Sequence, residues 1–161
     1  MTDNRKSLDL TLYDAVQTTR PLIRNIVAAV DATLKGTGVT VGVRAVLEVL
    51  FAADNASLPE VTKHLNLTRQ FAHRMLGEAA DAGFVERKPS PTRKGAHVYR
   101  LTNKGREAIK AIRAQEQEYL RAFMKGHSEE DLRAFCRVQS ALNRFFEDLP
   151  ARTTTAKENQ K

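Results

Sequence analysis

The segment 57–102 constrains the fold of this chain most, because it combines helix-start signals, a sharp turn and a basic hairpin. Ser57 and Glu60 have the spacing of a capping box, in which each side chain bonds the backbone N–H of the other residue and starts a helix. Asn66 tolerates the left-handed conformation that ends such a helix in a turn, and Thr68 is placed to cap the next helix. The segment therefore predicts two helices joined by a tight turn.

The second of these helices, expected at about 68–83, has two unlike faces. Its inner stripe consists of Ala72, Met75, Leu76 and Ala79, and Gly83 is suited to end it in a left-handed cap. Its other face carries the long hydrogen-bonding side chains Arg69, Gln70, His73 and Arg74. Donors near the start of a second helix, behind a short turn, are how a helix-turn-helix presents its recognition helix to the major groove.

A hairpin is predicted after Gly83. Residues 84–87 and 98–101 have the composition of strands, and the prolines and glycine between them exclude a helix. The stretch from 87 to 106 has basic residues at 87, 88, 93, 94, 100, 104 and 106 and contains no acid. We therefore expect a basic wing at about 88–97 that attracts phosphates.

Three motifs in this order resemble the winged helix-turn-helix of the MarR (multiple antibiotic resistance regulator) family. They are Leu58…Val61…Leu65-Asn66-Leu67-Thr68-Arg69, then Ala82-Gly83-Phe84-Val85-Glu86-Arg87, then Leu101-Thr102-Asn103-Lys104-Gly105-Arg106. A long helix before the motifs and two after them also suit that family, so the resemblance covers about the whole chain. One departure lies in the wing, where the family commonly has Asp-Arg and this chain has Thr92-Arg93-Lys94-Gly95.

The expected fold is mainly α with a small β-hairpin wing, a winged helix-turn-helix flanked by dimerisation helices. The predicted parts are an N-terminal dimerisation helix region at 1–36, the DNA-binding domain at 37–102, C-terminal dimerisation helices at 103–150 and a disordered tail at 151–161. The flanking helices have more apolar surface than a small winged domain can cover, which favours an intermolecular bundle. The resemblance implies the same homodimer.

Proline, capping and loop signals add three predictions about the helices before the central segment. Pro21 interrupts the first helix and predicts either a kink near Arg20 or a second helix capped by Thr19. Thr40 is placed to cap a helix that runs to about Ala53, and 54–56 is expected to be a loop.

The candidate DNA-binding residues are Thr68, Arg69, Gln70, His73 and Arg74 on the recognition helix, with Arg93 and Lys94 on the wing. Arginine pairs bidentately with guanine and glutamine with adenine, and the wing cations are expected in the minor groove or on its phosphates. Phe71 either contacts a thymine methyl or packs on a neighbouring helix, and the pattern leaves both open.

Composition favours a nucleic-acid partner and excludes several other classes. The net charge is +7 and the pI is about 9.8. No phosphate loop, nucleophile elbow or paired-carboxylate motif indicates an enzyme, and the four scattered histidines lack the spacing of metal ligands, so no metal or cofactor is expected. Cys136 lies on an apolar stripe and is expected to be a buried structural thiol.

No targeting signal or membrane span is visible in the sequence, and a single cysteine suits the reducing cytoplasm. The resemblance implies a repressor of pseudo-palindromic operators that responds to a small anionic or aromatic ligand, bound between the dimerisation helices and the winged domain. Arg44 is either solvated or faces that cleft. Two alternatives stay open: a winged-helix adaptor that binds protein and not DNA, and a metal-sensing winged-helix repressor, which the missing thiol ligands disfavour.

Overall fold

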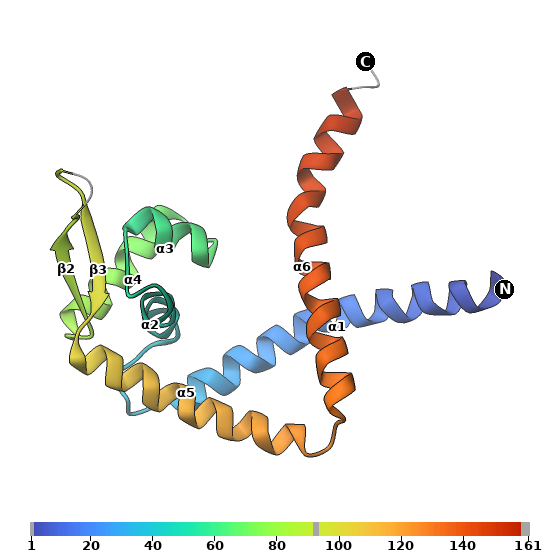
Figure 1. Cartoon of the computed structure of the whole chain (residues 1–161), viewed down its shortest axis with the longest axis horizontal. Helices are drawn as coiled ribbons and strands as arrows, with labels where there is room; N and C mark the ends of the chain where they lie inside the picture. Colours follow the sequence, from blue (N-terminus) through green and yellow to red (C-terminus); the bar gives the residue numbers. More distant parts are fainter. Residues whose placement is uncertain (1, 92–93, 159–161) are drawn as a thin grey trace. The chain divides into compact units, whose positions relative to one another are not determined.

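The computed structural model describes the backbone of residues 2–91 and 94–158. The elements in order are α1 (Thr2–Leu34), α2 (Val41–Ala53), β1 (Asn55–Ala56), α3 (Leu58–Leu65), α4 (Arg69–Asp81), β2 (Val85–Pro89), β3 (His97–Leu101), α5 (Asn103–Met124) and α6 (Glu129–Glu158) (Figure 1). Helices with one small antiparallel sheet confirm the predicted fold class. The chain forms two compact units, Met1–Ala114 and Gln115–Lys161, so the first unit contains the beginning of α5.

The core of the first unit is built around α2. This helix buries Val43, Val46, Leu47, Val49 and Leu50, and it begins where the Thr40 hydroxyl accepts the Val43 N–H at 3.2 Å. The same core cluster contains the fully buried side chains of Val61 from α3, Leu76 from α4 and Ile109 from α5. The helical stripes read from the sequence therefore face one common core, because each stripe repeats at the spacing of one helix face.

The two helices of the central motif begin and end where their local signals predicted. The Ser57 N–H donates to the Glu60 carboxylate at 2.7 Å in a capping box that begins α3. Asn66 ends α3 in the left-handed region with a φ of 50°, and the Thr68 hydroxyl accepts the Phe71 N–H at 3.3 Å. The predicted helix-turn-helix is thus formed by α3 and α4.

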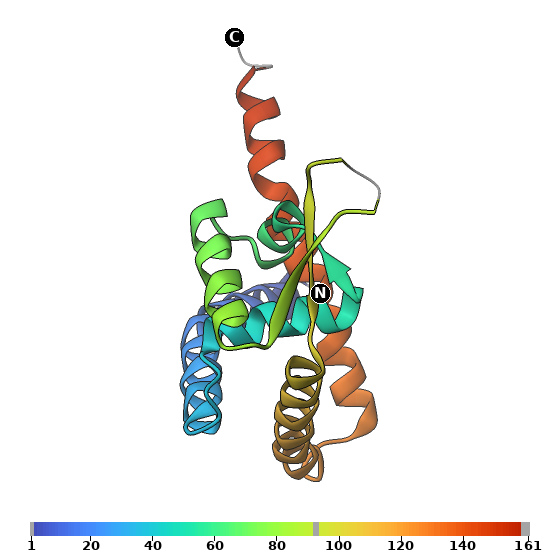
Figure 2. The same ribbon diagram turned by 90° about the vertical axis from the view of Figure 1, so that its left-hand side faces the viewer.

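The wing is a three-stranded antiparallel sheet in the order β1-β3-β2 (Figures 1 and 2). In the hairpin Glu86 lies opposite Arg100, and Arg87 lies opposite Tyr99. The short strand β1 was predicted as loop and is a correction, since Asn55 pairs with Arg100 of β3. Two residues contain no periodicity of their own, so only the neighbouring strand makes them a strand.

Of the two alternatives predicted for the first helix, the structure contradicts a second helix capped by Thr19. α1 runs as one helix across Pro21, and Thr19 does not cap a second helix. Instead the Thr19 hydroxyl donates backwards to the Ala15 carbonyl at 3.3 Å. A proline removes one backbone donor and leaves the other helical hydrogen bonds in place, so the helix can continue past it.

In the second unit, Ser128 caps α6 as predicted, because its hydroxyl accepts the Asp131 N–H at 3.1 Å. The helix continues through Pro150 to Glu158, whereas the sequence predicted its end at Pro150 and a disordered tail behind it. Cys136 is a second correction: it is exposed and not buried. The apolar stripe beside it remains uncovered in the described part of the chain, since Phe135 and Phe145 are also exposed.

Candidate nucleic-acid interface

The predicted recognition residues lie on the outer face of α4. Arg69, Gln70, His73 and Arg74 are all exposed, while Ala72, Met75, Leu76 and Ala79 of the same helix are buried. Thr68, which caps the helix, is exposed beside them. The first two turns of α4 thus expose hydrogen-bond donors to solvent, while the apolar face of the same helix packs on the core.

Phe71 belongs to this outer surface. Its ring is 40% exposed, and the Arg74 guanidinium lies over it at 4.6 Å from the ring centroid. Arg74 also approaches the Glu78 carboxylate at 3.6 Å in an exposed pair, and such pairs are weak. Arg74 is therefore oriented along the helix by a ring and a carboxylate on its own helix.

A groove of about 610 Å³ lies between α4 and the wing. Arg69 and His73 line it from α4, and Arg87 and His97 line it from the hairpin. The start of α3, from Ser57 to Glu60, forms part of its wall. Arg87 and His97 were not predicted as site residues, because their place on the α4 side of the sheet depends on strand register.

The wing contributes fewer of its predicted residues. Lys94 is exposed at the hairpin tip. Arg93, predicted to act with it, lies outside the described residues. The wing part of the predicted site is therefore represented in the structure by Lys94.

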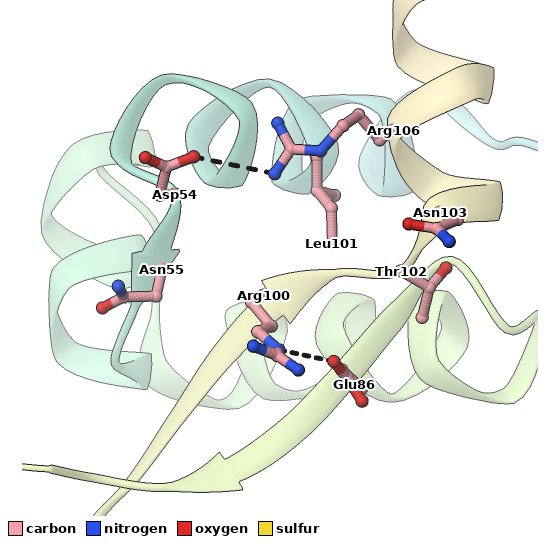
Figure 3. A pocket seen from close by; sticks show the side chains of 8 residues that line it. All are labelled: Asp54, Asn55, Glu86, Arg100, Leu101, Thr102, Asn103 and Arg106. Carbon is pink, nitrogen blue, oxygen red and sulfur yellow. Dashed lines mark hydrogen bonds and ion pairs between the residues drawn. The ribbon is translucent and has the colours of Figure 1, made fainter.

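The outer face of the hairpin is charge-compensated. The Nζ of Lys88 lies 3.0 Å from the Glu86 carboxylate. Arg100, the partner of Glu86 across the strands, also pairs with this carboxylate (Figure 3). Hydrogen bonds from Lys88 and then Arg100 hold the pKa of the Glu86 carboxyl below its ordinary value. Figure 3 also shows Arg106 directed at Asp54, with 3.6 Å between guanidinium nitrogen and carboxylate oxygen.

These contacts change how the basic run is interpreted. Lys88, Arg100 and Arg106 all have carboxylate partners, Glu86 and Asp54. Both acids lie outside the one-sign stretch in sequence: Glu86 directly precedes it on β2, and Asp54 follows the end of α2. The pairing of Glu86 with Arg100 could have been found by aligning the two predicted strands, because opposite charges are favoured across an antiparallel pair.

In the part of the chain that the structure describes, His, Cys, Asp and Glu side chains form no group of three that could hold a metal ion. No described helix combines the length and apolar character needed to cross a membrane.

No protein-family model matches the chain. It is 46% identical to a MarR family transcription regulator of known crystal structure, with a TM-score of 0.80 and coverage of 86% of this chain and 92% of that one. The chain belongs to the MarR family. It is therefore a transcriptional regulator, and its winged helix-turn-helix is the DNA-binding part of a MarR family protein.

Two more distant proteins also resemble this chain. The chain is 24% identical over 115 residues to YdgJ, an uncharacterized HTH-type transcriptional regulator of Bacillus subtilis (strain 168), covering 71% of this chain and 70% of YdgJ. The fold is shared with FabT of Streptococcus pneumoniae, solved in complex with DNA, at 20% identity and a TM-score of 0.74 over 86% of this chain and 99% of FabT. The shared fold therefore covers nearly the whole of FabT.

Proposed function

We propose that this MarR family regulator binds a pseudo-palindromic DNA duplex as a homodimer and represses transcription from it. The observation that carries the proposal is the exposed donor face of α4 beside a groove with cationic walls. Its contact residues are Thr68, Arg69, Gln70, His73 and Arg74 in the major groove and Arg93 and Lys94 at the wing. Each protomer then reads one half-site, about one helical turn from the other.

The exposed apolar faces of the flanking helices support the homodimer. On α1 the exposed large apolar side chains are Leu8, Leu10, Leu12, Tyr13, Leu22, Ile23, Ile26 and Val27. On α5 and α6 they are Tyr119, Leu120, Phe123, Met124, Phe135, Val138, Phe145, Phe146 and Leu149. Large apolar side chains exposed along a helix in such numbers are typical of interaction sites.

Control by a small anionic or aromatic ligand is the finer part of the proposal, and family membership supports it. The ligand would act by binding more tightly to one spacing of the two recognition helices than to another. A repressor of this kind acts where the chromosome is, so we place it in the cytoplasm. Its partners are then duplex DNA, a second copy of the chain and that ligand.

DNA binding by this face is tested with full-length variants in salt titrations of duplex affinity. Arg69→Ala should relax sequence preference by about 1–3 kcal/mol at one base position. Lys94→Ala should weaken binding to every sequence and reduce the log–log salt slope by about 1. Lys125→Ala, which removes an exposed cation of the second unit, is the control and should change neither quantity.

The result that contradicts the proposed DNA face is unchanged affinity in both Arg69→Ala and Lys94→Ala. An affinity for duplex that hardly depends on salt would instead favour the adaptor that binds protein. A shift that requires added metal would favour the metal-sensing repressor.

The dimer is tested by sedimentation of Phe145→Glu, which places a charge within the exposed apolar stripe of α6. Ser140→Glu adds the same charge at an exposed position on the other side of the helix. Phe145→Glu should sediment as a monomer and Ser140→Glu as a dimer. A dimer in both variants would remove α6 from the interface.

A further inference from the structure

Two neighbouring cations of β2 have different electrostatic surroundings. Successive side chains of a strand point to opposite faces, so Lys88 shares the outer face with Glu86, and Arg87 shares the other face with His97. Lys88 Nζ lies 3.0 Å from the Glu86 carboxylate. Arg87 Nη2 lies 2.9 Å from His97 Nδ1.

The contact between Arg87 and His97 orients the arginine without neutralising it. A guanidinium has only donors, so Nδ1 of His97 accepts this hydrogen bond in the tautomer that carries its proton on Nε2. In the described part of the chain Arg87 forms no ion pair with a carboxylate. Arg87 therefore keeps its full positive charge and has one of its nitrogens held in place.

This charge faces the groove between α4 and the wing. Arg87 and His97 line the groove opposite Arg69 and His73. Glu60 is the one carboxylate among the described lining residues. It is already bound by the Ser57 hydroxyl and by the Ser57 N–H, which together lower the pKa of its carboxyl. The groove thus combines cationic side chains with a carboxylate whose hydrogen-bonding capacity is partly used.

We propose that Arg87 binds a backbone phosphate of the DNA strand that passes between α4 and the wing, and that His97 is its positioning residue. A guanidinium fork matches two phosphate oxygens, and a preset orientation reduces the entropy lost when that contact forms. This inference rests on the proposed DNA-binding face. It adds a phosphate contact at the base of the wing to the contacts proposed for α4 and the wing tip.

The test compares Arg87→Met with Lys88→Met in the full-length protein, using duplex affinity over a range of salt. Arg87→Met should lower affinity about tenfold or more for specific and random duplex alike and reduce the log–log salt slope by about 1. Lys88→Met removes the same charge one residue away but from a compensated pair, so it should change the slope by less than about one half. Thermal melting checks that both variants are folded.

A salt slope for Arg87→Met equal to that of the wild type would overturn the proposal. A loss of affinity in Lys88→Met as large as that in Arg87→Met would also overturn it. If Arg69→Ala and Lys94→Ala weaken binding while Arg87→Met does not, this inference fails and the proposed DNA face survives. If none of the three weakens binding, the DNA face itself is wrong.

The role of His97 is tested by His97→Leu and His97→Gln. Leucine removes the acceptor, whereas the glutamine oxygen can accept from Arg87. His97→Leu should lose affinity severalfold, and His97→Gln should recover most of that loss with a wild-type salt slope. Equal affinities of the two variants, whether both reduced or both unchanged, would exclude a positioning role.

Discussion

Gly105 at the start of α5 lies so close to Phe84 that a Cβ at this position would be 2.0 Å from the Phe84 carbonyl oxygen. The same oxygen accepts the Thr102 N–H at 3.0 Å. The Thr102 hydroxyl donates to the Gly83 carbonyl at 2.7 Å, and Lys104 Nζ donates to the Ala82 carbonyl at 2.7 Å. The beginning of α5 is therefore bonded to three successive carbonyls directly behind the recognition helix.

Gly105→Ala should destabilise the protein by about 1–3 kcal/mol, the usual effect of forcing extra atoms into a packed site. The nearest atom is the Phe84 carbonyl oxygen, which accepts a hydrogen bond from the Thr102 N–H, so this oxygen cannot move aside without disturbing that bond. Gly77→Ala on α4 is the matched control, because a Cβ there meets no atom within 4 Å. The control should gain about 0.5–1 kcal/mol. Chemical denaturation measures both, and equal stabilities would contradict the close packing.

Gly83→Ala should cost about 1–2 kcal/mol, because Gly83 has a φ of 75° and an L-residue with a Cβ is strained there. Asparagine visits this region more readily, so Gly83→Asn should lose less. Denaturant midpoints of the two variants give the comparison. A loss that is as large for asparagine as for alanine would assign the cost to something other than backbone conformation.

Lys104→Met should weaken DNA binding without the salt signature of a phosphate contact. The Lys104 ammonium caps the Ala82 carbonyl and lies 4.6 Å from the centroid of the Phe84 ring, so it helps to hold the end of α4. We expect a loss of about 1 kcal/mol in stability and an unchanged salt slope of duplex binding.

Lys110→Met is the control for that variant, since Lys110 pairs with Glu107 at 3.2 Å on the same helix. Lys110→Met should leave both the stability and the salt slope of duplex binding near their wild-type values. A salt slope reduced by about 1 in Lys104→Met would make this lysine a phosphate contact after all.

Glu86→Gln should remove a contribution to stability that depends on pH. Lys88 and then Arg100 hold the pKa of the Glu86 carboxyl below its ordinary value of 4.5 in the folded protein. The contribution is therefore present above about pH 4.5 and is lost as the pH falls through the folded pKa. The difference between wild type and Glu86→Gln in free energy of unfolding should narrow below pH 4.5. A difference that stays constant down to pH 3 would contradict the linkage.

Most of the helical framework could be predicted from the sequence because its signals are local. Thr40, Ser57, Thr68, Thr102 and Ser128 each bond within three residues of themselves at a helix start. Such bonds need only the chain nearby, so a short stretch of sequence contains all the information. The inner stripe of α4 followed from helix periodicity for the same reason.

The predicted charge pattern of the wing was incomplete because charge compensation is not local. The run from 87 to 106 contains no acid, yet Asp54 reaches Arg106 from more than fifty positions earlier in the chain. Side-chain alternation along β2 places Lys88 on the face of Glu86, whereas strand register decides that Arg100 lies opposite Glu86 and that Arg87 lies in the groove with His97. A shift of the hairpin by one residue would exchange these faces.

The sequence alone determined where the helices begin, which faces of them are apolar, and that the chain is a winged helix-turn-helix regulator of the MarR type. Only the tertiary structure decided that 55–56 is a strand, that Cys136 is exposed, and which cations remain uncompensated. The physical reason is the distance along the chain between the residues that interact. Caps and stripes depend on residues three or four positions apart, whereas strand pairing, burial and the cancellation of charge depend on which distant segments fold against each other.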